Sequence, residues 1–313
     1  MPSDSNPVRV DAIVLGGSYA GLSAAMQLAR ARRAVLVIDA GLRRNRFAES
    51  SHGFLGQDGR APAAIAADGK AQLLAYPEVR WLDGAALHAE KVVDGFAVQV
   101  QAEMRADGQA DGQAGQTFQA KRLVLATGVV DRLPALEGLA QRWGKSVFHC
   151  PYCHGYELDN GRIGVLAFGP LSFHHAMMLP YWGPVTYFLN DAFAPDEAQL
   201  GALTARGVAI EHGRVERLVD HASVEMEDGR RLPMDGLFAL GRTQMASPVA
   251  EQLGCAFDEG PLGPFIRTDA AKETTVPGVF ACGDAARMAG NVAIAVGDGA
   301  LAGGSAHQSM IFR

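Results

Sequence analysis

The chain has 313 residues, of which 48% are hydrophobic and 20% charged, and its net charge is −6. This length exceeds the needs of one small domain and indicates about two domains. The acidic balance gives no support for binding to nucleic acid or to an anionic membrane. The first residues lack the basic and apolar segments of a signal peptide, and no apolar run is long enough to span a bilayer, so we expect a cytoplasmic enzyme.

The first predicted elements form a βαβ unit. Residues 10–17, VDAIVLGG, are an apolar run that predicts a buried parallel strand. Residues 21–33 predict a helix with one apolar side, and residues 34–39 predict the next strand. Together they predict the start of a dinucleotide-binding domain.

The turn between the first strand and the helix matches the dinucleotide fingerprint at its outer positions. Gly16 and Gly21 are the first and third glycines, and Ser18 takes the place of the middle one. These glycines permit a tight turn and close helix–strand packing, while the helix N-terminus attracts a pyrophosphate. Asp39, at the end of the second strand, has the spacing that binds a ribose. We therefore predict a dinucleotide site here.

The next part of the chain predicts hairpins and strands. Turn signals at Asp94-Gly95 and Asp228-Gly229 predict two β-meanders. Residues 106–116, ADGQADGQAGQ, are small and polar and predict a flexible loop at a hairpin tip without catalytic content. Residues 121–128, KRLVLATG, predict another buried strand that ends in a turn.

A second βαβ pattern follows, and the final third then resumes the first. Strands at 162–168 and 185–189 flank a predicted helix at 171–179. A strand at 279–282, a turn at Gly283-Asp284 and a glycine-spaced helix at 291–306 complete the first domain. We predict an α/β protein with two Rossmann-like dinucleotide-binding domains, the second inserted in the first. The outer domain comprises 1–131 plus 241–313, and the inserted domain comprises 132–240.

Two of the four cysteines, Cys150 and Cys153, lie in the stretch HCPYCHGYE at the start of the predicted insertion. A zinc site would need two more ligands at workable spacing, and His149 and His154 are too close to supply them. A structural disulfide is disfavoured in a reducing compartment. A redox-active dithiol is therefore the favoured interpretation, while the isolated Cys255 and Cys282 are expected to be small buried hydrophobic residues.

Two further segments carry a family resemblance. Residues 125–128 read LATG, and residues 275–284 read TVPGVFACGD. In order and spacing over nearly the whole chain, the sequence resembles the low-molecular-weight thioredoxin reductase group of FAD flavoproteins. The resemblance implies that FAD is bound by residues at these turns and at the start of the last helix, namely Thr127, Gly128, Gly283, Asp284, Asn291 and Ala293. It also implies a homodimer, with residues 306–313 placed to reach the partner's active site.

The same resemblance implies separate roles for the two sulfurs. Cys153 would face the flavin as a charge-transfer thiolate, and Cys150 would exchange with the substrate. The family's usual aspartate after the second cysteine is His154 here, and an imidazole with a pKa near neutrality could act as general base. The phrases CHGYE and SHGFL resemble the dithiol oxidases of gliotoxin, holomycin and romidepsin biosynthesis, which implies that His52 lies near the flavin or packs there.

The inserted domain departs from the family at its nucleotide site. In the stretch VLAFGPLS, Ala167 and Ser172 replace the first and third glycines, and Pro170 removes a backbone donor. The residues after the next strand, LNDAF, contain no arginine for the 2′-phosphate of NADPH. We therefore expect a retained fold that binds no pyridine nucleotide.

These observations favour an enzyme through which electrons flow from a dithiol to oxygen. The leading interpretation is an FAD-dependent dithiol oxidase that forms an intramolecular disulfide in a small secondary metabolite, with O2 as acceptor and H2O2 as product. An NADPH-dependent thioredoxin-type reductase and a flavin-containing redox sensor remain alternatives. Phe148, Tyr152 and Tyr156 are compatible with a hydrophobic substrate or with core packing.

Overall fold

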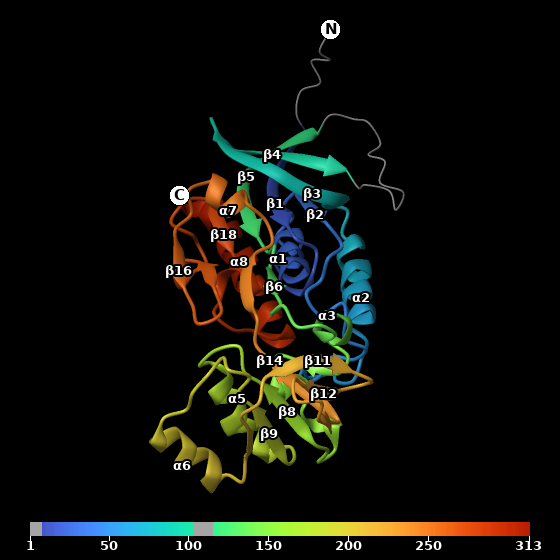
Figure 1. Ribbon diagram of the computed structural model, residues 1–313. Coiled ribbons are helices and arrows are strands. Elements are labelled where there is room, and N and C mark those ends of the chain that lie inside the picture. The colour runs from blue at the N-terminus through green and yellow to red at the C-terminus, as the bar shows by residue number, and fades with distance from the viewer. Residues whose placement is uncertain (1–7, 103–114) are drawn as a thin grey trace. The chain divides into compact units, whose positions relative to one another are not determined.

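The computed structural model describes residues 8–102 and 115–313 (Figure 1). The loop expected at 106–116 lies largely outside the described residues. The chain forms two compact units. One comprises Met1–Arg44, Ala63–Val130 and Thr243–Arg313, and the other comprises Asn45–Pro62 and Asp131–Arg242. We call them the outer unit and the inserted unit.

The compact units differ from the expected domains at residues 45–62. Residues 45–62 were expected in the outer domain, but they belong to the inserted unit. Their contacts explain why. Ser51 and Arg60 form an antiparallel bridge that folds the segment back on itself, and a Cβ atom added to Gly144 would lie 2.7 Å from Phe47 Cβ, so this segment packs directly on the inserted unit.

The outer unit is built on a six-stranded sheet that contains the predicted first βαβ unit. Strands β1, β2, β5 and β18 are parallel neighbours, and the long β3 and β5 extend beyond them to pair antiparallel with β4. The elements at the sheet are β1 (Val8–Leu15), α1 (Tyr19–Arg30), β2 (Val35–Asp39), α2 (Pro62–Leu74), β3 (Val79–Val92), β4 (Gly95–Ala102), β5 (Gln116–Leu125) and β18 (Val279–Ala281). The remaining elements are α7 (Val249–Gln252), β16 (Phe257–Glu259), β17 (Pro264–Ile266), η3 (Gly283–Ala286) and α8 (Val292–Phe312).

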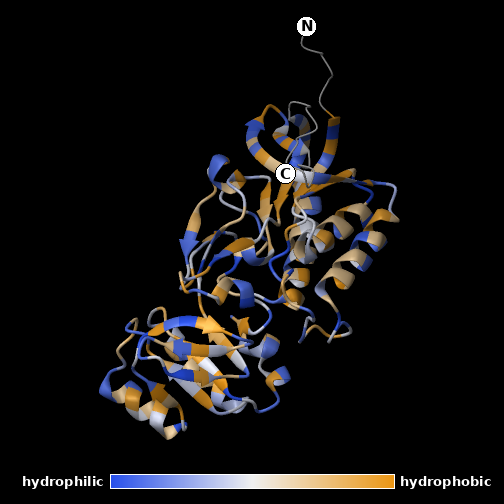
Figure 2. Cartoon of the chain, turned by 45° about the vertical axis from the view of Figure 1, so that its right-hand side comes forward, coloured by the Kyte–Doolittle hydropathy of each residue, from blue (hydrophilic) through white to orange (hydrophobic). Residues whose placement is uncertain are grey.

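Apolar strand residues form the core of this unit. The strand residues Ile13, Val14 and Val124 are fully buried, as the continuous apolar runs predict for a parallel sheet covered on both faces. Figure 2 shows hydrophobic residues along the strands at the centre of this unit. Helices α1 and α8 pack together closely, because a Cβ atom at Gly299 would lie only 2.0 Å from the Ala20 carbonyl oxygen. The glycine spacing of the last helix therefore serves helix packing.

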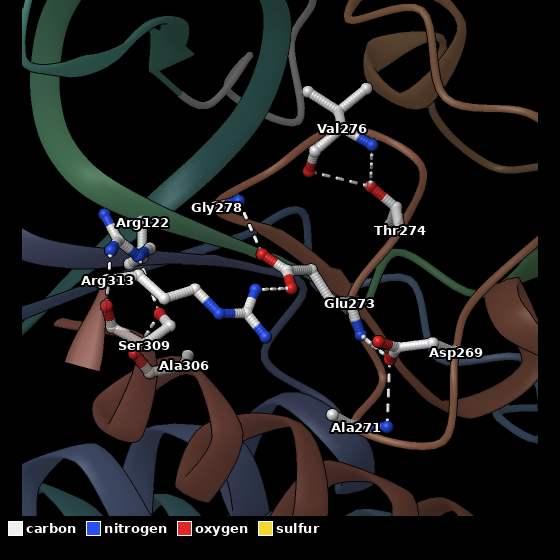
Figure 3. Close-up of polar contacts among 10 residues, drawn as sticks. All are labelled: Arg122, Asp269, Ala271, Glu273, Thr274, Val276, Gly278, Ala306, Ser309 and Arg313. Carbon is white, nitrogen blue, oxygen red and sulfur yellow. Dashed lines mark hydrogen bonds and ion pairs between the residues drawn. The ribbon is translucent and has the colours of Figure 1, made fainter. Parts of the chain in front are cut away.

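The end of α8 is tied to its own unit by a polar network (Figure 3). Arg122 on β5 donates from Nε to Ser309 Oγ (2.7 Å) and from Nη2 to the Ser309 carbonyl (2.8 Å). Arg313 pairs with Glu273, whose other oxygen accepts from the Gly278 N–H (2.9 Å). The final turn of α8 is thus held by the same chain, and a role for residues 306–313 in a partner's active site stays a prediction.

The inserted unit holds a five-stranded parallel sheet in the order β10-β9-β8-β14-β7 and an antiparallel sheet in the order β11-β12-β13. The predicted second βαβ pattern is confirmed as β8 (Ile163–Leu166), α5 (Ser172–Met178) and β9 (Val185–Phe188). The other elements are α3 (Leu139–Arg142), β7 (Val147–Phe148), α4 (Pro151–His154), η1 (Tyr156–Leu158), η2 (Leu179–Tyr181), α6 (Glu197–Ala205), β10 (Ala209–Glu211), β11 (Val215–Val219), β12 (Ser223–Met226), β13 (Arg231–Pro233) and β14 (Gly236–Ala239).

The chain passes between the units within β6 (Val129–Arg132) and next to the start of β15 (Arg242–Met245). The β-meanders expected around Asp94-Gly95 and Asp228-Gly229 are present as β3–β4–β5 and β11–β12–β13. Among the residues described, none of the helices combines the length and the apolar composition that crossing a bilayer requires.

Candidate functional site

The predicted dinucleotide-binding residues of the outer unit meet at one edge of its sheet. Leu15 at the end of β1 is in register with Leu125 at the end of β5, which is in register with Ala281 at the end of β18. The turns that follow these strands therefore emerge side by side, as ligand-binding turns do in open α/β sheets. The structure places here the predicted residues Gly16, Ser18, Gly21, Asp39, Thr127, Gly128, Gly283 and Asp284.

The first turn has the shape that a dinucleotide requires. Gly16 has a φ of +101°, and a Cβ atom on it would lie 2.3 Å from the Ala126 carbonyl oxygen. A Cβ atom on Gly21 would lie 1.8 Å from the Gly16 carbonyl oxygen. Ser18 is the N-cap of α1 and makes no side-chain capping hydrogen bond, and the first turn carries no acidic residue. The helix N-terminus is therefore suited to bind a pyrophosphate.

The acidic residues at this edge already have partners in the same unit. Asp39 Oδ1 accepts from the Gly17 N–H (2.9 Å), which fixes the carboxylate beside the turn. Asp284 Oδ2 accepts from Arg44 Nη1 (2.8 Å), and both side chains are mostly buried. Arg44 was not among the residues predicted from the sequence, although the basic run RRNR after β2 is a signal for it.

The last helix completes the edge. Asn291 is its N-cap and accepts from the Ile294 N–H (2.8 Å), and Ala293 lies in its first turn. Gly128 has a φ of +69°, and a Cβ atom there would meet no atom within 4 Å, so the chain leaves open space at this turn. The residues of this edge therefore fit a flavin dinucleotide: a close-packed phosphate turn, a carboxylate for the ribose, and a second helix N-terminus.

The two cysteines of the inserted unit are joined in a disulfide. Cys150 follows β7 and is the N-cap of the one-turn helix α4, and Cys153 lies in that helix, with a Cα–Cα distance of 5.3 Å. The Cys153 N–H donates to the Cys150 carbonyl (3.2 Å). The helix thus holds the two sulfurs at bonding distance, so the pair can open to a dithiol and close again.

His154 lacks the near-neutral imidazole expected from the sequence. Its ring stacks on Phe148 with centroids 4.2 Å apart, and within the described residues neither ring nitrogen has a hydrogen-bond partner. Burial, followed by the charges of His149 and His52, lowers its pKa to about 4. The expected near-neutral pKa is therefore wrong for this structure, because the ring is taken out of water without an acidic partner.

A second histidine of the inserted unit has acidic neighbours instead. His52 Nδ1 lies 3.3 Å from Glu157 Oε1 and 3.7 Å from Asp58 Oδ1. Its Nε2 lies 2.9 Å from Ser50 Oγ. Neither Glu157, the last residue of the phrase CHGYE, nor Ser50, the residue before the phrase SHGFL, was predicted as a site residue. The expected position of His52 near the flavin stays a prediction.

The aromatic residues around the disulfide separate into two groups. Phe148 is 8% exposed and belongs to the core. Tyr152 and Tyr156 are 74% and 83% exposed, and Tyr152 makes an edge contact with Trp182 at a centroid distance of 5.4 Å. Core packing therefore explains Phe148 but not the two tyrosines, of which Tyr152 lies between the two cysteines in the sequence and Tyr156 three residues after Cys153.

The altered nucleotide stretch of the inserted unit is closed by its own hydrogen bonds. Ser172 Oγ donates to the Gly169 carbonyl (2.6 Å) and also lies 2.7 Å from the Tyr187 hydroxyl. Asn190, after β9, donates to the Ala167 carbonyl (3.3 Å) and accepts from the Val215 N–H (2.9 Å). The side-chain polar atoms of Ser172 and Asn190 are thus used within the protein.

Comparison with known proteins gives consistent matches. A family model described as pyridine nucleotide-disulphide oxidoreductase matches residues 10–178 and 187–299. The thioredoxin reductase tcpT of Claviceps purpurea is 33% identical, over 96% of this chain and 94% of the relative. A solved oxidoreductase from Agrobacterium tumefaciens is 50% identical with a TM-score of 0.91, covering 97% of this chain and 99% of that one. The structure of HlmI is 32% identical with a TM-score of 0.86, covering 98% and 93%.

Proposed function

Because the chain belongs to the pyridine nucleotide-disulphide oxidoreductase family, as a thioredoxin reductase-like flavoprotein, we propose that it is an FAD-dependent dithiol oxidase. Its substrate is a small-molecule dithiol, in which it forms an intramolecular disulfide. Dioxygen is the final acceptor and hydrogen peroxide the product. The protein is an oxidoreductase. In this proposal electrons flow from the substrate dithiol to dioxygen.

FAD is the cofactor of this family, and the outer unit has the residues to hold it. Gly16, Gly21 and the N-terminus of α1 would take the pyrophosphate, and Asp39 would take the adenosine ribose. Asp284 and the N-terminus of α8 would hold the flavin end. When bound, FAD supplies an acceptor for two electrons that can pass them to dioxygen.

The disulfide supplies the exchange chemistry. A substrate thiolate attacks Cys150 Sγ, the Cys150–Cys153 bond breaks, and Cys153 leaves as a thiolate. The second substrate thiolate then attacks the mixed disulfide at the substrate sulfur. Cys150 leaves as a thiolate in its turn, and the product disulfide forms. The net change is one substrate dithiol oxidised and one protein disulfide reduced, with the two substrate protons released to bases or solvent. The exposed Tyr152 and Tyr156 offer aromatic surface to a small apolar substrate.

The closed nucleotide stretch of the inserted unit carries the proposal. Ser172 and Asn190 use their polar atoms inside the protein, and the residues after β9 contain no arginine. A 2′-phosphate would lack a guanidinium partner, and a pyrophosphate would meet Pro170 in place of a backbone donor. Without a pyridine nucleotide to supply electrons, the dithiol becomes the electron source.

Anaerobic titration of the flavin-loaded protein tests this direction. Dithiothreitol should bleach the flavin absorbance in near-stoichiometric amounts, whereas micromolar NADPH or NADH should leave it oxidised. Admission of air should restore the flavin and release peroxide. Rapid bleaching by micromolar NADPH would establish the alternative, an NADPH-dependent thioredoxin-type disulfide reductase. The names of relatives such as the thioredoxin reductase sirT of Leptosphaeria maculans favour that alternative.

A further inference from the structure

The proton of the substrate thiol needs an acceptor, and His154 is poorly suited to that role. An ordinary thiol has a pKa of about 8.5, so only a few per cent is thiolate at pH 7. Burial holds the pKa of His154 near 4, far below that of a thiol. Transfer of a thiol proton to this ring is therefore strongly uphill, and a general base works best with a pKa near the working pH.

His52 has the arrangement that His154 lacks. Its Nδ1 faces Glu157 Oε1 at 3.3 Å, with Asp58 Oδ1 further away at 3.7 Å. Asp58 Oδ1 also accepts a hydrogen bond from the Gly53 N–H (2.7 Å). Glu157 is therefore both the closer carboxylate to His52 and the one without this competing contact to Gly53. Because a carboxylate can only accept, Nδ1 carries the ring proton, and the lone pair of neutral His52 lies on Nε2.

The free lone pair meets a hydroxyl. Ser50 Oγ lies 2.9 Å from His52 Nε2, so the hydroxyl donates to the ring. The chain from Ser50 through His52 to Glu157 has the order of a nucleophile-activating triad: a hydroxyl, an imidazole and an orienting carboxylate. Here the hydroxyl can pass a proton inward to Nε2, while Glu157 stabilises the imidazolium that forms.

Glu157 connects this chain of groups to the segment that carries the disulfide. Glu157 lies in η1, which is separated from α4 and its Cys153 by Gly155. The charge of His52 acts on the pKa of His154, the residue next to Cys153, so the two rings are within electrostatic reach. The titratable groups around His52 are thus Glu157 from η1, Asp58 from its own segment and His154 from α4.

We propose that His52, oriented by Glu157 and linked to Ser50, is the base that receives the proton of the substrate thiol attacking the Cys150–Cys153 disulfide. Glu157 is a positioning residue in this arrangement, and Ser50 is the relay to solvent or substrate. The assignment rests on the proposed function for its direction only. In the reverse reaction, the same His52 returns the proton to the thiolate that leaves.

The test is the pH dependence of anaerobic flavin reduction by dithiothreitol in single turnover. His52→Gln should be about 10²-fold slower at pH 7, and the gap should close by about pH 9, where the thiol arrives as thiolate. Glu157→Gln should be about tenfold slower at pH 7, and the gap should close over the same pH range as for His52→Gln, because the change removes the carboxylate that orients the ring. His212→Gln, an exposed histidine of the same unit, is the matched control with the parent profile.

Three outcomes would overturn the assignment. If the rate of flavin reduction in His52→Gln has the same pH dependence as in the parent, or is lowered by the same factor at every pH, the His52 ring serves packing only. A pH-dependent loss in His154→Ala or His149→Gln, but not in His52→Gln, would move the base to those rings. If NADPH reduces the parent protein, the proposed direction of electron flow is wrong. The same variants are then reduced with NADPH, and the rate of their reaction with oxidised dithiothreitol is measured. His52→Gln should show the same fold loss there.

Discussion

At the scale of single residues, the two cysteines of the inserted unit and three of its histidines have different surroundings that imply different chemistry. Cys150 caps α4 and Cys153 lies within it. His175 is buried and the ring nitrogens of the half-buried His154 are shielded from solvent, whereas His52 is held by polar neighbours. Residue type alone does not distinguish these histidines, because the difference lies in burial and in hydrogen-bond partners.

The two sulfurs should be separable by spectroscopy. We expect Cys150→Ser to leave a Cys153 thiolate against oxidised FAD, which gives a long-wavelength charge-transfer absorbance. Cys153→Ser should lack that band, and both variants should lose dithiol oxidation, since either change prevents disulfide formation. Absorbance spectra of the two flavin-loaded variants, with matched flavin content as control, decide the assignment. A band in Cys153→Ser alone would reverse the roles of the sulfurs.

At the scale of elements, α5 carries a buried histidine on the core side of the inserted unit. His175 is 4% exposed, and burial, followed by the charges of His149 and His174, lowers its pKa to about 4. The unfolded ring takes up a proton below about pH 6.5. The unfolded chain therefore binds more protons between pH 6.5 and 4, so the free energy of unfolding falls as the pH drops through this range.

This burial predicts a specific acid sensitivity. Between pH 7 and pH 5, His175 should account for a loss of about 2 kcal/mol in the free energy of unfolding. In His175→Phe the pH dependence should weaken by that amount, whatever the variant's stability at pH 7. Urea unfolding followed by tryptophan fluorescence measures it. His212→Gln, at an exposed histidine of the same unit, is the control, and an unchanged pH dependence in His175→Phe would contradict the assignment.

The register of the strands and the starting points of two helices explain where the dinucleotide-binding edge of the outer unit forms. The turns after β1, β5 and β18 meet because these strands are in register up to their last residues. Helices α1 and α8 both begin near this edge, and their close packing depends on the small residues Ala20 and Gly299. The element order thus brings two helix N-termini to one ligand, which favours its negatively charged groups.

At the scale of the whole molecule, we predict a homodimer. Large hydrophobic side chains of α8 remain exposed in the single chain: Leu301 is 47% exposed, Ile311 53% and Phe312 78%. Sedimentation at micromolar concentration should give twice the chain mass of 33.1 kDa. Leu301→Glu should shift the equilibrium toward the monomer, because it places a charge on an apolar helix face. A monomeric parent protein would refute the prediction.

The cofactor edge of the outer unit was predictable from local sequence. Gly16, Gly21 and Asp39 belong to one strand–turn–helix–strand unit, and the residues of this unit are neighbours in the chain as well as in space. Hydrophobic runs and turn residues determine such units with little help from distant segments. The resemblance to thioredoxin reductase-like flavoproteins, the family and the α/β fold are confirmed for the same reason.

The position of residues 45–62 and the contacts made there depended on distant segments. The pair of Arg44 and Asp284 joins residues 240 positions apart, and the contact between His52 and Glu157 joins the two parts of the inserted unit. The burial of His154 against Phe148 likewise follows from packing after the chain has folded. Periodicity and motif spacing describe neighbours along the chain. The partners and solvent exposure of a side chain arise only when separated segments pack together, and these determine its pKa and its chemistry.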